Sequence, residues 1–159
     1  MPKAAPTETH WLSAEEMRTW RGLVQLIVEL HAEQDAALMD SHGISEGEYA
    51  VLACLSEAED RRLRMCDLAS HLRLSPSGLT RRIDGLVEQG YVSRQPSEAD
   101  RRVMLAVITD SGVRKLETAA PTHVAAVRAS LIDHLSKAQV KALGDVLDHV
   151  RASRAGGAA

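Results

Sequence analysis

The sequence predicts a mainly α-helical fold with one small β-hairpin past the middle of the chain. Apolar residues recur at helical spacing over most of its length, and two S-x-x-E capping boxes begin helices near the N-terminus. Two short strand-like runs, separated by a polar loop, have the pattern of a hairpin. The 159 residues, 45% hydrophobic and 26% charged, suit one domain or one compact unit of two lobes with a sizeable core.

Most of the expected helices begin at a residue that can cap the first turn. Ser13 and Ser45 each start a capping box. Ser75 is followed by proline at the first helical position, where no backbone N–H is needed, and Thr109 and Ser136 precede the last two helices. The helices are expected over residues 13–39, 45–58, 65–72, 75–89, 109–135 and 136–152.

The remaining segments separate these helices or interrupt them. Gly43 and Gly90 follow helix ends, where a left-handed residue is favoured. Pro121 is expected to kink or interrupt its helix, because it lacks a backbone donor. The other elements are expected at 1–10 (disordered leader), 60–64 (turn and short strand), 91–95 and 103–108 (hairpin strands), 96–102 (hairpin loop) and 153–159 (frayed tail).

Composition excludes several classes of protein. Aromatic residues make up only 3% of the chain, which argues against a carbohydrate-binding face or a stacking platform for single strands. No apolar run is long enough for a membrane span, and the N-terminus lacks the apolar segment of a secretory signal. Cys54 is expected to pack as a small apolar side chain. Cys66 is expected to be a free thiol in a reducing cytoplasm, with a redox switch as the alternative.

Charge is divided unevenly along the chain. The net charge of −3, taken alone, would argue against nucleic acid as a partner. Residues 61–102, however, contain nine arginines and five acidic residues, which gives +4, while the rest of the chain carries −7. A basic segment on an acidic body is the distribution expected of a protein that presents one surface to a polyanion.

Residues 45–108 have the element order of a winged helix-turn-helix: helix, short strand, short helix, tight turn, helix and hairpin. The second helix of the motif keeps Leu79 and Ile83 inward and presents a polar N-terminal face outward. Small residues and hydroxyls there allow close approach to DNA, and arginines can reach phosphates or guanine. The candidate DNA-binding residues on this helix are Ser75, Ser77, Gly78, Thr80, Arg81 and Arg82.

The hairpin loop is the second candidate DNA contact. Arg101 and Arg102 lie at its tip, where they could enter a minor groove whose negative potential attracts arginine. Asp100 is expected to pair with one of these arginines and to fix the loop geometry. Arg94, at the base of the hairpin, is a candidate phosphate contact.

The run DLASHLRLSPSGLTRRIDGLVEQGYVSRQPSEADRRVMLAVITDSG resembles MarR-family transcriptional regulators. The D-R-R wing, followed by a strand and L/I-T-x-x-G, is the most specific part, and the resemblance covers nearly all of residues 11–152. It implies a repressor that binds a pseudo-palindromic double-stranded operator as a homodimer, with recognition helices in major grooves and wing arginines in minor grooves. Residues 11–44 and 109–152 would form the helical dimerisation region, and 45–108 the DNA-binding domain.

The resemblance also raises the question of an effector. Many members of the family release DNA when a small phenolic or carboxylate ligand binds between the dimer body and the DNA-binding domain. Core packing is the competing role for Trp20, and surface exposure for Arg21. The side chains that could line such a pocket are Trp11, Trp20, Arg21, His31, His123 and Arg128.

Neither a metal nor any other cofactor is expected. His31 and Asp35 have a spacing of four residues, which suits a metal on a helix, and His42 is near in sequence. The H-x-x-x-H of zinc-responsive relatives is missing, because Val127 follows His123 at that spacing. Peroxide-sensing relatives carry a reactive cysteine near the start of the first helix, where this chain has none.

Two other classes of function remain as alternatives. An enzyme is disfavoured, because the sequence contains no nucleophile elbow, HExxH, P-loop or paired-glycine fingerprint. A helical interaction module that has lost DNA binding is disfavoured by the arginines that occupy both candidate DNA contacts.

Overall fold

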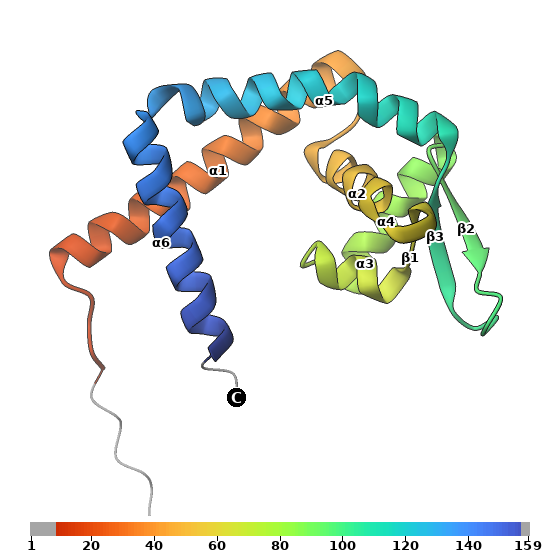
Figure 1. Cartoon of the computed structure of the whole chain (residues 1–159), viewed down its shortest axis with the longest axis horizontal. Helices are drawn as coiled ribbons and strands as arrows, with labels where there is room; N and C mark the ends of the chain where they lie inside the picture. Colours follow the sequence, from red (N-terminus) through yellow and green to blue (C-terminus); the bar gives the residue numbers. More distant parts are fainter. Residues whose placement is uncertain (1–8, 157–159) are drawn as a thin grey trace, which may run out of the picture.

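The described part of the chain, residues 9–156, forms six α-helices and one three-stranded sheet in this computed structural model (Figure 1). This confirms the predicted fold class. Two 3-10 turns occupy Glu59–Arg61 and Ile132–His134. The helices are α1 (Ala14–His42), α2 (Glu46–Glu57), α3 (Met65–His71), α4 (Pro76–Glu88), α5 (Asp110–Ser130) and α6 (Lys137–Gly156), and the strands are β1 (Arg62–Arg64), β2 (Val92–Pro96) and β3 (Met104–Ile108).

α1 and α5 lie side by side and extend away from the rest of the fold (Figure 1). α1 begins at the predicted capping box, in which the Ser13 backbone N–H donates to the Glu16 carboxylate at 2.7 Å. This hydrogen bond holds the pKa of Glu16 below its ordinary value. α1 ends at Gly43, whose φ of 64° is left-handed, and Ser45 then caps α2 with a second capping box.

Residues 46–108, from α2 to β3, form a compact unit that we call the winged lobe. Its strands are antiparallel in the order β1-β3-β2, so β3 lies in the centre. The register places Leu63 of β1 and Arg94 of β2 opposite Ala106 of β3. The loop between β2 and β3 projects from the lobe as the wing (Figure 1).

The hydrophobic core belongs mainly to the winged lobe. Leu38 of α1 and Ala119 of α5 are also fully buried in it, and they attach both long helices to the lobe. Because these side chains are apolar and close-packed, the lobe is a rigid support for its exposed residues. The other buried core residues are Ile44, Val51, Leu52, Leu55, Leu68, Ala69, Leu79, Ile83, Leu86, Val92, Ala106 and Ile108.

Three expectations near the C-terminus differ from the structure. Pro121 does not interrupt α5, because its ring lies on the exposed side and removes only one backbone hydrogen bond. α5 instead ends at Ser130, five residues before the expected end, at the non-helical backbone of Leu131. α6 continues to Gly156, beyond the expected end at 152. Residues 1–8 of the expected leader and 157–159 of the expected tail lie outside the described residues.

The two cysteines occupy different environments. Cys54 is half-buried against the core, as expected of a small apolar side chain. Burial raises the pKa of its thiol, and the Glu57 carboxylate adds to the shift, so the group stays neutral. Cys66 is exposed and free, as expected of a reduced thiol, and a redox switch at this residue stays the alternative.

Candidate nucleic-acid interface

The helix-turn-helix is formed by α3, the turn at residues 72–75 and α4. Arg73 adopts a φ of 55°, which reverses the chain between the two helices. The Ser75 side chain then accepts the Gly78 backbone N–H at 3.1 Å, and Pro76 occupies the first helical position, as predicted. The inward side of α4 is buried in the core, so the opposite side of its first turns faces solvent.

The outward face of α4 carries most of the predicted DNA-binding residues. Ser75, Ser77, Thr80 and Arg81 are exposed, and Gly78 lies between them. The Thr80 hydroxyl donates to the Pro76 carbonyl at 2.8 Å, which leaves the oxygen free to accept a further hydrogen bond. The start of α4 therefore presents small polar groups and one exposed guanidinium to any partner.

Arg82 does not share this outward face. It is half-buried and lies against the first turn of α2, where a Cβ added to Gly47 would be 2.6 Å from the Arg82 Cζ atom. The prediction that placed Arg82 on the outward face is therefore wrong for this structure. The physical reason is that Gly47 has no side chain, so α2 leaves room for the guanidinium group of Arg82.

The wing presents two exposed arginines on an ordered loop. Arg101 and Arg102 lie at its tip, and neither forms an ion pair within residues 9–156. The Asp100 carboxylate was predicted to pair with a guanidinium, but it accepts the Arg102 backbone N–H at 2.9 Å instead. The Asp100 carbonyl also accepts the Val103 N–H at 2.9 Å. Asp100 thus braces the loop through the backbone and leaves both arginines free.

Arg94 connects the wing to α4. Its guanidinium lies 2.6 Å from the Asp84 carboxylate and 3.4 Å from the Thr80 carbonyl. The side chain is only 31% exposed, so part of its charge is committed to this contact. The predicted phosphate contact by Arg94 stays a prediction, and the structure adds a second role, which is to hold the wing beside α4.

The predicted effector residues do not meet in one pocket of the single chain. Trp11 and Trp20 are 81% and 57% exposed, so Trp20 is not in the core of this chain. Arg21 is also exposed, and Arg128 pairs with Asp133. His123 lies on α5 with its ring 4.4 Å from that of Tyr49, between centroids.

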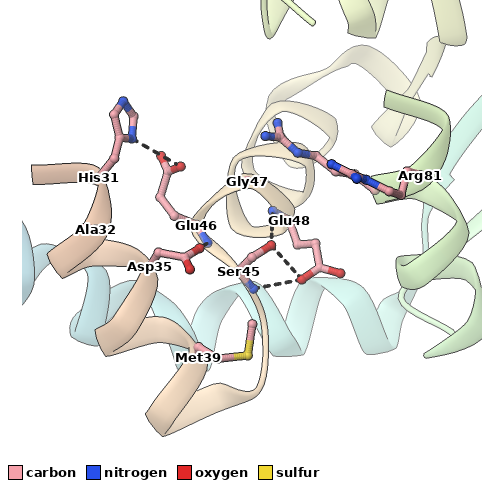
Figure 2. Close-up of a pocket in the computed structure, with 10 residues that line it drawn as sticks. His31, Ala32, Asp35, Met39, Ser45, Glu46, Gly47, Glu48 and Arg81 are labelled. Atoms are coloured by element: carbon pink, nitrogen blue, oxygen red, sulfur yellow. Dashed lines mark hydrogen bonds and ion pairs between the residues drawn. The ribbon is translucent and has the colours of Figure 1, made fainter. Parts of the chain in front are cut away.

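His31 instead lines a cavity of about 780 Å³ between α1, the first turn of α2 and α4 (Figure 2). Its Nδ1 atom lies 3.5 Å from the Glu46 carboxylate, and the Asp35 carboxylate accepts the Glu46 backbone N–H at 2.8 Å. Sequence reasoning missed Asp35 and Glu46 as pocket residues, because only the packing of α1 on α2 brings them together. Arg81 and Arg82 line the opposite wall.

Within residues 9–156, no three histidine, cysteine or acidic side chains cluster closely enough to hold a metal ion. No described helix is both long enough and apolar enough to cross a membrane.

Taken together, the helix-turn-helix and the braced two-stranded wing define a winged helix-turn-helix protein. A family model of the MarR family matches residues 44–104. The chain is 32% identical to the transcriptional repressor YetL of Bacillus subtilis, over 68% of this chain and 66% of that protein. It is 30% identical to the transcriptional regulator MhqR of the same species, over 69% of this chain and 73% of that protein. The chain belongs to the MarR family of transcriptional regulators.

Solved structures agree with this assignment. A MarR family regulator from Streptomyces coelicolor in complex with DNA is 35% identical, with a TM-score of 0.85 over 91% of this chain and 90% of that one. AbsC, another MarR family regulator of that species, is 32% identical, with a TM-score of 0.83 over 93% of this chain and 99% of that one. The family membership confirms a regulator rather than an enzyme.

Proposed function

We propose that this protein is a repressor that binds a pseudo-palindromic DNA operator as a homodimer. The observation that carries the proposal is the pairing of two exposed surfaces on one rigid lobe. These are the polar start of α4 and the arginine tip of the wing. The similar regulator from Streptomyces coelicolor was solved in complex with DNA, and the relative YetL is named a repressor.

In this proposal α4 enters the major groove, with its first turns toward the bases. Ser75, Ser77 and Thr80 contact phosphates or base edges, and Gly78 permits close approach of the backbone. Arg81 reaches guanine or a phosphate. The wing follows the adjacent minor groove, where Arg101 and Arg102 meet its negative potential. The net charge of +4 over residues 61–102 supports the same surface.

Arg81 and Arg82 offer a direct test within α4. We expect Arg81→Ala to weaken binding to DNA from the chain's own promoter region by about 1–3 kcal/mol, because its guanidinium faces outward. Arg82→Ala should cost less, because Arg82 packs on α2. Fluorescence anisotropy with labelled promoter fragments would measure both, and equal losses would contradict the placement of Arg82. Absence of specific binding by the unchanged protein would overturn the proposed function.

The proposed homodimer rests on apolar helix faces that the single chain leaves exposed. α6 has no buried residue, and both it and the N-terminal half of α1 expose large apolar side chains. Large apolar side chains that gather on exposed helix faces of a single chain mark an interaction surface. The residues are Trp20, Leu23, Val24, Leu26, Ile27 and Val28 on α1, and Val140, Leu143, Val146, Leu147 and Val150 on α6.

A charge placed on this face should disrupt the dimer. We expect Val146→Asp to shift the protein toward the monomer, because a buried unpaired carboxylate is strongly disfavoured. Val146 is 59% exposed in the single chain, so its own fold should tolerate the change. Sedimentation equilibrium would measure the shift, with Lys141→Ala on the same helix as the control. An unchanged dimer would place the interface elsewhere.

The proposal extends to a small-molecule effector and to a cytoplasmic location. A phenol or carboxylic acid in the cavity beside His31 would contact α1, α2 and α4 at once. Ligand binding there would favour one placement of α4 over another, and so change DNA affinity. Screening such compounds for release of bound promoter DNA tests this part of the proposal.

A further inference from the structure

The C-terminal end of α6 and the turn of the helix-turn-helix share a second cavity. This cavity, of about 730 Å³, is lined by Arg73 from the turn, by Arg151 and Arg154 from the last turns of α6, and by Ala155. In Figure 1, α6 leaves the end of α5 and runs back on the same side of α1 and α5 as the winged lobe. Residues far apart in sequence thus bring three guanidinium groups to one space.

The charges around this cavity have one sign. All charged side chains that line it are arginines. Arg151 has an acidic neighbour, Asp148, at 3.7 Å, but both side chains are about four-fifths exposed, and such a pair contributes little. Neither Arg73 nor Arg154 forms an ion pair within residues 9–156. Unneutralised like charges around one space create a positive potential that attracts an anion.

The helix dipole explains only part of this arrangement. A cation near the carboxyl end of a helix is favoured, which accounts for Arg151 and Arg154 as α6 residues. It does not account for Arg73, which lines the same cavity from the turn between α3 and α4. The cavity therefore gathers positive charge from two independent parts of the fold.

The position of Arg73 indicates which anion fits. Arg73 precedes Ser75, the N-cap of α4, by two residues, and so lies at the edge of the proposed DNA-facing surface. All three arginines are exposed, which suits the backbone of a long polymer better than an enclosed small ligand. We propose that Arg73, Arg151 and Arg154 bind phosphates of the DNA duplex beside the base pairs that α4 contacts. This inference rests on the proposed function and gives α6 a DNA contact in addition to its apolar face.

The salt dependence of DNA binding tests the inference. Arg151→Gln with Arg154→Gln removes the α6 charges, and the slope of log affinity against log salt should fall by about 0.9 for each phosphate that the variant no longer neutralises. Affinity should fall by a similar factor for all duplexes, because phosphate contacts carry no base preference. Arg73→Gln should lower the slope further. The matched control is Lys137→Gln with Lys141→Gln, which removes the same charge from the start of α6 and should leave the slope nearly unchanged.

The outcomes separate this inference from the proposed function. If the unchanged protein binds promoter DNA and the α6 variant keeps both its affinity and its slope, the inference is overturned and the proposed function stands. If the variant alters the dimer in sedimentation without altering the slope, the arginines serve contacts between subunits, and the inference is also overturned. If the unchanged protein does not bind DNA, both proposals fall.

Discussion

Arg101→Ala with Arg102→Ala is expected to weaken DNA binding more than any single substitution in α4. Each arginine is exposed at the wing tip, and each replacement should cost about 1–3 kcal/mol of binding. The proposed dimer presents two wings, so the double substitution would remove the wing arginines from both DNA contacts. The salt slope should also fall, by about 0.9 for each phosphate that the wing no longer neutralises. Anisotropy titrations with promoter DNA at several salt concentrations would measure both quantities.

The control for the wing is Arg114→Ala with Lys137→Ala, which removes the same charge from α5 and α6. Its affinity should stay close to that of the unchanged protein, apart from a small effect of net charge. Folding of the wing variant should be unaffected, because the brace is provided by the Asp100 carboxylate and the backbone of Arg102 and not by the two guanidinium groups. A wing variant with unchanged affinity and slope would rule out the wing as a DNA contact.

Gly112→Ala is expected to be the most destabilising of these substitutions. Gly112 is buried in the first turn of α5, and a Cβ there would lie 2.2 Å from the Tyr91 carbonyl oxygen and 2.8 Å from the Ile108 Cγ1 atom. The Tyr91 oxygen cannot easily move, because it accepts the Thr109 backbone N–H at 3.0 Å and the Thr109 hydroxyl at 3.2 Å. Overpacking and weakened hydrogen bonds together should cost about 2–4 kcal/mol.

Gly47→Ala is the matched control, since Gly47 is also a buried glycine in the first part of a helix. The three atoms nearest its added Cβ would all belong to the guanidinium end of Arg82, which can swing toward solvent. The higher helix propensity of alanine offsets part of the cost, so the net change should stay within about 1 kcal/mol. Urea unfolding would measure both variants. Equal stabilities of the two would mean that the contact between α5 and the turn at Tyr91 is not rigid.

The structure of the winged lobe was largely predictable, because its helix caps and its hairpin pattern depend on residues that are close together in the sequence. Ser75 and Gly90 delimit α4 through contacts with residues only a few positions away, and the strand pattern needs only its own hairpin. The end of α5 was not predictable in the same way. Apolar spacing continues beyond Ser130, and the helix ends at the backbone conformation of Leu131, which no nearby glycine or proline announces.

The candidate site was predicted in part, and its errors share a cause. The helical pattern placed Arg82 beside Arg81, but the direction of its side chain depends on the space above Gly47 in another helix. The predicted effector residues share only an aromatic or charged side chain, and the structure distributes them over separate surfaces. Helical spacing already places His31 near Asp35, but Glu46 joins them only because the chain reverses at Gly43 between α1 and α2.

The sequence alone determined the helix starts, the wing and the separation of a basic segment from an acidic body, because each depends on residues close together in the chain. Tertiary structure alone decided that Arg82 packs inward and that Arg94 holds the wing to Asp84. It also decided that Arg73 shares a cavity with Arg154. These contacts join residues from different elements, and their geometry follows from how the helices pack, which no local spacing records.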